Sequence, residues 1–231
     1  MRRRGFTLVE ALVVVLLTAL VLQGGWAVLA TLRKAGGRAW ETAEGLETVR
    51  TTAWLLREEF GGSVPFRDWW PGGGDTVSLR AYRGLALVIG AEPGGGVKVC
   101  FRGIRSPNPD KDSILFLAED GSWTDHSLMG RVRGDPGCMG GGEGWEEVWE
   151  VVPDPGTMVL GRIFERGSYH LTLGALRYRR GGGGRQPLTP TRIAAGRLVG
   201  GKGPGDGLRW TLLLSNPWKD DDSLAWSGWV R

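Results

Sequence analysis

Residues 6–32 read FTLVEALVVVLLTALVLQGGWAVLATL, and this apolar stretch decides the architecture of the chain. Glu10 is its only charged residue. A transmembrane helix needs about 20 consecutive apolar residues, so the stretch is long enough to cross a bilayer. The arginines at positions 2–4 precede it, and the positive-inside rule keeps such a cluster in the cytoplasm. The sequence therefore predicts a single-pass membrane protein whose body lies on the opposite side of the membrane.

The residues just before the apolar stretch do not follow the pattern of an ordinary secretory signal, which has a small-residue cleavage site after its apolar run. Here no such site follows, and Gly5 stands directly before Phe6. The stretch from Arg4 to Glu10 (RGFTLVE) resembles the class III signal of type IV prepilins and pseudopilins. The resemblance implies that a prepilin peptidase cuts after Gly5 and that the new N-terminal amine of Phe6 is methylated.

The lone acid in the apolar stretch needs a partner. A carboxylate inside a transmembrane segment costs about 2.5–3.5 kcal/mol on insertion scales. The resemblance implies that Glu10 pairs with the N-terminal amine of Phe6 in a neighbouring subunit and so sets the register of an assembled fibre. The alternative is that Glu10 lies in the headgroup region and reaches water.

The helix is expected to continue beyond the membrane. Apolar residues recur at steps of three or four between residues 38 and 60, which is the spacing of one helix face. No proline occurs before Pro65. We therefore predict one helix from Phe6 to Phe60.

Beyond Pro65 the pattern changes to short apolar runs separated by Gly, Pro, Asn and Asp. Helical patterns do not alternate with these runs, which argues against parallel β-α-β units. The sequence thus predicts an α+β fold, in which a long N-terminal helix packs on a mainly antiparallel β head. The predicted strands are Thr76–Tyr82, Leu85–Ile89, Val97–Phe101, Ser113–Leu117, Val148–Val152, Met158–Phe164, Tyr169–Tyr178, Ile193–Val199, Leu208–Leu214 and Ser223–Val230.

Four segments follow from this interpretation. They are a prepilin leader over residues 1–5, the transmembrane half of the helix over residues 6–32, its amphipathic half over residues 33–62 and a globular β-rich head over residues 63–231.

The end of the helix carries a weaker resemblance. Residues 53–60 (AWLLREEF), followed by Pro65, are similar to the end of the helix in W-type minor pilins and in J-type pseudopilins of type II secretion. The first likeness implies a minor pilin that takes part in type IV pilus assembly, with twitching motility or DNA uptake in natural transformation as its setting. The second implies a pseudopilin of a type II secretion system.

The resemblance also implies a location and partners. The chain is expected in the bacterial inner membrane, with its head in the periplasm and the assembled fibre reaching the outer membrane or cell surface. The implied partners are a prepilin peptidase, inner-membrane lipid and other pilins, which pack against the N-terminal helix.

Two cysteines are present, Cys100 and Cys138, both on the predicted outer side, where oxidising conditions permit a disulfide. Closing that loop stabilises the head by about 4 kcal/mol in the chain-entropy model. The alternative is two unpaired thiols.

An enzyme finds little support in the sequence. His126 and His170 are the only histidines, and neither belongs to a known catalytic or metal-binding motif. No phosphate-binding glycine loop and no Cys/His metal spacing occurs, so we predict neither a cofactor nor a metal. Asp220–Asp222 can offer oxygen ligands to Ca²⁺, as in some pseudopilins, but it lacks the spacing of a calcium loop and is interpreted as a solvated turn.

Charge is unevenly distributed along the chain. Residues 41–159 hold 11 Lys and Arg against 19 Asp and Glu, whereas residues 160–231 hold 12 against 5. Such asymmetry indicates either two solvated faces of one domain or a face that meets an acidic partner. A pair of exposed tryptophans beside the basic residues Arg177, Arg179, Arg180 and Arg185 would stack on single-stranded DNA. A DNA- or surface-binding module at the pilus tip is therefore the alternative of another class.

Overall fold

The computed structural model describes residues 7–92, 96–136, 138, 144–152, 156–200, 207–214 and 224–230. The predicted cleavage junction between Gly5 and Phe6, and the triplet Asp220–Asp222, lie outside these ranges. The chain forms two compact units, Met1–Glu47 and Thr48–Arg231. The elements are α1 (Leu8–Phe60), β1 (Trp69–Pro71), β2 (Thr76–Glu92), β3 (Gly96–Gly103), β4 (Asp112–Ala118), β5 (Trp123–Pro136), β6 (Trp145–Val152), β7 (Met158–Thr172), β8 (Ala175–Arg180), β9 (Arg185–Pro187), β10 (Ile193–Gly200), β11 (Leu208–Leu214) and β12 (Leu224–Val230).

The predicted long helix is confirmed. α1 is a single α-helix of 53 residues. Every side chain from Thr7 to Gly36 is exposed, although most of them are apolar. From Thr7 to Gly36 the helix therefore exposes its apolar side chains along its whole length.

Six strands of the second unit close into a barrel. Their order is β2-β3-β6-β5-β4-β7, and β7 pairs with β2 again, so the ring has no free edge. All of these pairings are antiparallel. Alternate side chains fill the interior, in which Trp149, Phe116 and Ile163 are completely buried. The barrel thus has a hydrophobic core of its own.

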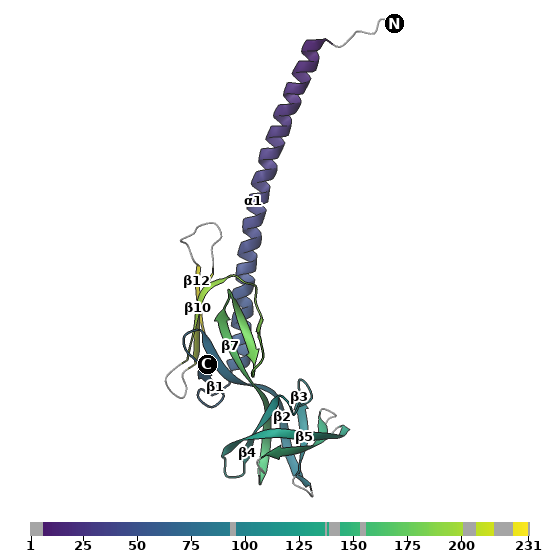
Figure 1. The fold of residues 1–231 in the computed structure, drawn as a ribbon, viewed down its shortest axis with the longest axis vertical. Coiled ribbons are helices and arrows are strands. Elements are labelled where there is room, and N and C mark those ends of the chain that lie inside the picture. The colour runs from purple at the N-terminus through teal and green to yellow at the C-terminus, as the bar shows by residue number, and fades with distance from the viewer. Residues whose placement is uncertain are drawn as a thin grey trace. The chain divides into compact units, whose positions relative to one another are not determined.

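The same two strands β2 and β7 continue out of the barrel into a second layer (Figure 1). There the strand order is β1-β2-β7-β8-β9. One face of this five-stranded sheet packs against the last turns of α1, where Leu56 and Phe60 are buried with Trp69 and Tyr169. The α+β prediction of a helix packed on an antiparallel head is therefore confirmed.

A separate three-stranded sheet completes this second core. Its order is β10-β11-β12, and both pairings are antiparallel. Alternation along β11 directs Leu208, Trp210 and Leu212 inward, onto the core that contains Phe60. The other face of the sheet carries Arg209 and Thr211.

Two sequence predictions in this region are wrong in their extent. The predicted strand Tyr169–Tyr178 is a hairpin, because Leu173 and Gly174 adopt φ angles of 50° and 75° and form a turn between β7 and β8. The two predicted strands Thr76–Tyr82 and Leu85–Ile89 form the single strand β2, since the chain forms a β-bulge at Arg83 rather than a turn.

Three strands were not predicted. β5 was not predicted because its sequence WTDHSLMGRVRGDP is largely polar. Only part of one face is apolar, where Leu128 is buried at 1% exposure. β1 and β9 were not predicted because each has only 3 residues, too few to show a pattern of alternation.

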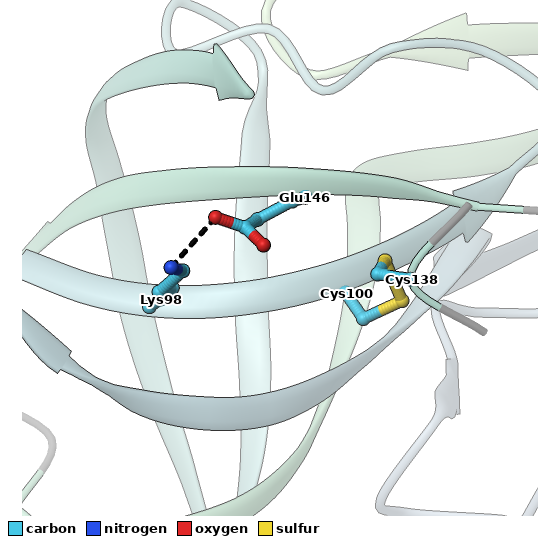
Figure 2. Close-up of a disulfide and its surroundings, with 4 residues drawn as sticks. All are labelled: Lys98, Cys100, Cys138 and Glu146. Atoms are coloured by element: carbon cyan, nitrogen blue, oxygen red, sulfur yellow. Dashed lines mark ion pairs between the residues drawn. A yellow bond between two sulfur atoms is a disulfide. The ribbon is translucent and has the colours of Figure 1, made fainter. Parts of the chain in front are cut away.

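A disulfide joins Cys100 of β3 to Cys138, which follows β5 (Figure 2). The two Cα atoms are 5.7 Å apart. Nearby, the ion pair between Lys98 and Glu146 links β3 to β6 at 2.7 Å. Of the two alternatives for the cysteines, the paired state is therefore the one found.

Candidate functional site

The start of α1 is held by a reciprocal pair of hydrogen bonds. The Thr7 backbone N–H and hydroxyl both donate to Oε2 of Glu10 at 2.9 Å, and the Glu10 backbone N–H donates to the Thr7 hydroxyl at 3.4 Å. This is a capping box, in which an N-cap threonine and a glutamate three residues later satisfy donors that the helix leaves free. Sequence reasoning treated Glu10 alone, although the Thr-x-x-Glu spacing was a signal for the pair.

The capping box uses one of the two carboxylate oxygens of Glu10. Within the described residues, Oε1 of Glu10 accepts no hydrogen bond, so it can accept one from an amine of another chain. Gly5 and Phe6, the other residues predicted for processing and assembly, lie outside the described ranges.

The helix that follows is a candidate membrane span. Among the described residues, α1 is the one helix long and apolar enough to cross a bilayer, and its apolar window is not buried by the rest of the chain. This agrees with a membrane-anchored protein.

The structure brings three of the four predicted arginines together. Arg177 and Arg179 lie on the same face of β8, and Arg185 of β9 is directly opposite Arg179. Arg180 lies on the other face of β8, where its guanidinium is 3.4 Å from Oε2 of Glu165. The fourth arginine is thus paired with an acid on the opposite face of β8 and is separated from the other three.

The three grouped arginines are anchored by backbone oxygens. Arg177 donates to the carbonyls of Thr172 and Arg185, and Arg179 donates to that of Gly183. No carboxylate within the described ranges forms an ion pair with any of the three. Their positive charge is therefore not neutralised by the described part of the chain.

These arginines belong to a row that crosses all five strands of the outer layer. From β9 to β1, directly opposed residues are Arg185, Arg179, Ser168, Ser78 and Trp70. Neighbouring strands lie about 4.8 Å apart, so the row spans about 19 Å. We call the face that carries this row the basic face; it is the side of the sheet opposite α1.

His170 lies on the basic face beside the arginines. Its Nε2 is 2.8 Å from the Ser168 hydroxyl and its Nδ1 is 3.1 Å from the Thr76 hydroxyl. Burial lowers the pKa of this imidazole, and the positive charges of Arg185 and Arg179 lower it further. Sequence reasoning considered His170 only for catalysis or metal binding and did not consider Ser168, although their spacing of two in a strand places both on one face.

Among the described residues, which do not include Trp218, no pair of exposed tryptophans lies beside the arginines. Trp69 is buried in the core at 2% exposure, and only its neighbour Trp70, at 36%, is on the basic face. Its ring centroid is 5.2 Å from the guanidinium of Arg80. In the described part of the chain, the basic face thus offers one aromatic surface, at the end of the row opposite Arg185.

A second polar cluster lies where the barrel meets the outer layer. Glu165 accepts a hydrogen bond from the Tyr178 hydroxyl at 2.8 Å and forms ion pairs with Arg83, Arg105 and Arg180. Burial raises the pKa of the Glu165 carboxyl, but the Tyr178 hydrogen bond and the arginines outweigh it and hold the pKa below its usual range. With all these bonds made, the cluster is suited to hold the two layers together.

No cluster suited to metal binding lies in the described part of the chain, where no group of three or more His, Cys, Asp and Glu side chains comes together. Asp220–Asp222 is outside that part.

Comparison with protein families matched the start of the chain. The model of the prokaryotic N-terminal methylation motif matches residues 1–22. Comparisons with curated proteins and with solved structures gave no significant match. The matched motif supports a type IV pilin-like protein and implies processing by a prepilin peptidase and assembly with other pilins. Prepilin-type pilins are structural proteins rather than enzymes.

Proposed function

We propose that this chain is a minor pilin that takes part in the assembly of a type IV pilus. The observation that carries the proposal is the junction between Gly5 and Phe6, placed directly before an apolar helix with Glu10 as its lone acid. The size of the β-rich head supports a subunit of low copy number rather than the repeating subunit of the shaft.

In this proposal the peptidase cuts after Gly5 and the amine of Phe6 is methylated. The Glu10 carboxylate then pairs with the amine of Phe6 in the neighbouring subunit. Such a pair satisfies an acid that is costly to leave alone in a bilayer. Thr7 keeps Oε2 of Glu10 occupied, which leaves Oε1 for the neighbour. Because Glu10 is present, the subunit has a neighbour above it and belongs just below the tip or in the shaft.

The proposed location is the inner membrane, with residues 6–32 spanning it, residues 33–62 leaving it as an amphipathic helix and the head over residues 63–231 in the periplasm. The arginines at positions 2–4 support this orientation.

The mature mass and N-terminal sequence test the proposal, measured in cells with and without the prepilin peptidase. A wild-type chain that begins at methylated Phe6, and a mutant-strain chain that keeps residues 1–5, are the expected results. The same uncut chain in both strains would rule the proposal out.

A J-type pseudopilin of a type II secretion system is the alternative within the same class. Deletion of the gene separates the two. Loss of pili with normal secretion supports the minor pilin, and loss of secretion with normal pili supports the pseudopilin.

The second candidate function is binding of single-stranded DNA by the basic face. Proteins that bind single-stranded DNA combine a basic surface with aromatic rings on which bases stack. The basic face has both, because it carries Trp70 and three arginines that have no acidic partner among the described residues. Each arginine that contacts a phosphate contributes about 0.7 to the slope of log K against log salt.

The test uses the full chain in detergent and a labelled oligothymidylate. The double variant R179Q/R185Q is expected to bind more weakly and to lower the salt slope by about 1.4. The matched control R197Q/R209Q removes two arginines from the three-stranded sheet and is expected to bind as wild type. Equal effects of the two variants, or no salt-dependent binding, would reject this candidate.

A further inference from the structure

A continuous chain of hydrogen bonds leads to the basic face. The Thr76 hydroxyl donates to Oδ1 of Asp75 at 3.0 Å. The same hydroxyl is 3.1 Å from Nδ1 of His170, and the Ser168 hydroxyl is 2.8 Å from Nε2 of that ring. The chain of bonds therefore runs from an acid in the turn before β2 to a half-buried serine in the row that carries the arginines.

The chemistry of these groups fixes where their protons lie. The carboxylate of Asp75 can only accept, so the single proton of the Thr76 hydroxyl is donated to it. Thr76 can then only accept from the imidazole, which places the proton of the neutral ring on Nδ1. Nε2 is consequently an acceptor, and the Ser168 hydroxyl donates to it. While His170 is neutral, the serine proton is used by the ring and is not available to a ligand.

The charged groups around this imidazole are mostly positive. Arg177 of β8 is directly opposite His170, and Arg179 and Arg185 follow on the same face. The described acid on this side is Asp75, and the flanking strand β1 carries no charged residue. Burial lowers the pKa of the imidazole, Arg185 and Arg179 lower it further, and Asp75 acts in the opposite direction. A second proton on the ring is therefore disfavoured while the face holds no anion.

An anion held by the arginines reverses this balance. Directly opposed side chains on neighbouring strands have Cβ atoms about 4.5–5.5 Å apart, so a phosphate bound by Arg179 and Arg185 lies close to Ser168. Its negative charge favours the protonated form of the imidazole beneath. Nε2 then donates to the Ser168 oxygen, and the serine hydrogen is released to donate to a phosphate oxygen. One proton taken up from solvent thus adds both a charge and a hydrogen-bond donor to the face.

We infer that Ser168, Arg179 and Arg185 form a phosphate subsite of the basic face, whose filling is coupled to the uptake of one proton. His170 is the group that takes up this proton. The inference rests on the second candidate function, binding of single-stranded DNA, for the identity of the ligand. Binding tightens as the pH falls, because the protonated ring is favoured in the complex. By linkage, the bound strand raises the pKa of His170 to the same extent.

The test measures binding of a labelled oligothymidylate to the full chain in detergent at pH 8 and pH 5, at one salt concentration. Thymine takes up no proton in this range, so the strand itself adds no pH dependence. Wild type is expected to bind at least tenfold more tightly at pH 5, and H170Q is expected to change less than twofold. H126Q is the matched control, because His126 is the other histidine of the chain and is buried in β5, and it should behave as wild type.

A second pair of variants separates the serine from the charge of the ring. Ser168→Ala removes the hydroxyl that is released toward the phosphate, and is expected to weaken binding at least threefold at pH 5 but less than twofold at pH 8. Ser78→Ala is its control, because Ser78 is directly opposite Ser168 and is not a member of the hydrogen-bonded chain. It is expected to bind as wild type at both pH values. Equal thermal midpoints of these variants ensure that the differences are not ones of folding.

Nitrogen spectra of the labelled imidazole test the proton positions directly. In H126Q the signal comes from His170 alone. The neutral ring is expected to carry its proton on Nδ1, and its pKa is expected to rise when the oligothymidylate is added. A neutral ring protonated on Nε2, or a pKa unchanged by the bound strand, would overturn the inference.

The binding curves separate this inference from the functions on which it depends. Binding that responds to salt but not to pH, or a pH dependence that persists in H170Q, removes the coupled subsite and leaves the second candidate function intact. No salt-dependent binding at either pH rejects that candidate and the subsite together. The N-terminal sequence of the same preparation reports on the minor pilin independently of both.

Discussion

Glu165 of β7 accepts a hydrogen bond of 2.8 Å from the hydroxyl of Tyr178, which lies on the neighbouring strand β8. The same carboxylate is paired with Arg83, and Arg83 is in turn 3.2 Å from Glu59 in the last turn of α1. The chain of contacts therefore joins the helix to the sheet at the level where the barrel begins.

Removal of the central acid is expected to destabilise the second unit strongly. Glu165→Ala removes the acceptor of the partly buried Tyr178 hydroxyl and the ion-pair partner of Arg180, while Arg83 and Arg105 keep Glu59 and Asp112. Breaking one partner of a buried ion pair costs about 3 kcal/mol or more. Denaturant unfolding of the full chain measures the loss. Glu119→Ala is the control, because this exposed glutamate is expected to change the free energy of unfolding by less than about 0.5 kcal/mol. Similar values for both variants would contradict the role of Glu165.

Acid is expected to weaken the fold through two carboxyls. Burial raises the pKa of Asp68, but hydrogen bonds from Arg67, Tyr82 and a backbone amide bring it below its usual range, and Glu165 behaves likewise. A carboxyl whose pKa is lower in the folded chain than in the unfolded chain is protonated at a lower pH when the chain is folded. The stability it contributes is therefore present above the unfolded pKa of about 4 and is lost as the pH falls through the folded value.

Thermal midpoints between pH 7 and pH 2 measure this effect. D68N/E165Q is expected to be less stable at pH 7 and to show a smaller further loss in acid than wild type. A variant curve parallel to that of wild type would show that other groups carry the acid sensitivity.

Loss of the disulfide is expected to destabilise the barrel. Cys100 and Cys138 are separated by 38 residues in sequence, and the chain-entropy model gives about 4 kcal/mol for a loop of this length. C100S/C138S measured in denaturant, and wild type measured with reductant, should agree. Lys98→Gln removes the neighbouring solvent-exposed ion pair and is expected to have a much smaller effect. A disulfide effect no larger than that of Lys98→Gln would contradict the prediction.

Substitution of the lone acid in the membrane helix is expected to separate processing from assembly. Glu10→Leu removes the proposed partner of the neighbouring amine while leaving Gly5 and Phe6 unchanged, so cleavage should persist and incorporation into fibres should fall at least tenfold. Thr18→Leu is the control, because among the described residues the Thr18 hydroxyl donates to the Val14 carbonyl of its own helix and to no other group. Mass spectrometry of the membrane fraction and of sheared fibres measures both steps. Normal incorporation of the Glu10→Leu chain would remove Glu10 from the assembly mechanism.

Local patterns in the sequence were enough to predict the helix, the α+β class and most strands. The period of three to four up to Phe60 is a property of neighbouring residues, and so is the alternation in Leu208–Leu214, whose bounds the structure reproduces. The prepilin motif is likewise a matter of fixed spacing around Gly5 and Glu10, and its match to residues 1–22 depends on no tertiary contact.

The pairing of strands that are distant in sequence could not be predicted from the sequence. Closure of the barrel depends on β2 meeting β7, more than seventy residues later, and no local pattern encodes that register. Alternation along β8 places Arg180 on the opposite face from Arg177 and Arg179. In contrast, only the pairing of distant strands places Arg185 beside Arg179 and Trp70 at the far end of their row. The sequence by itself determined the anchor, the helix and the β class, because these follow from contacts within a few residues; the tertiary structure decided which side chains share a face, because that depends on strands brought together from across the chain.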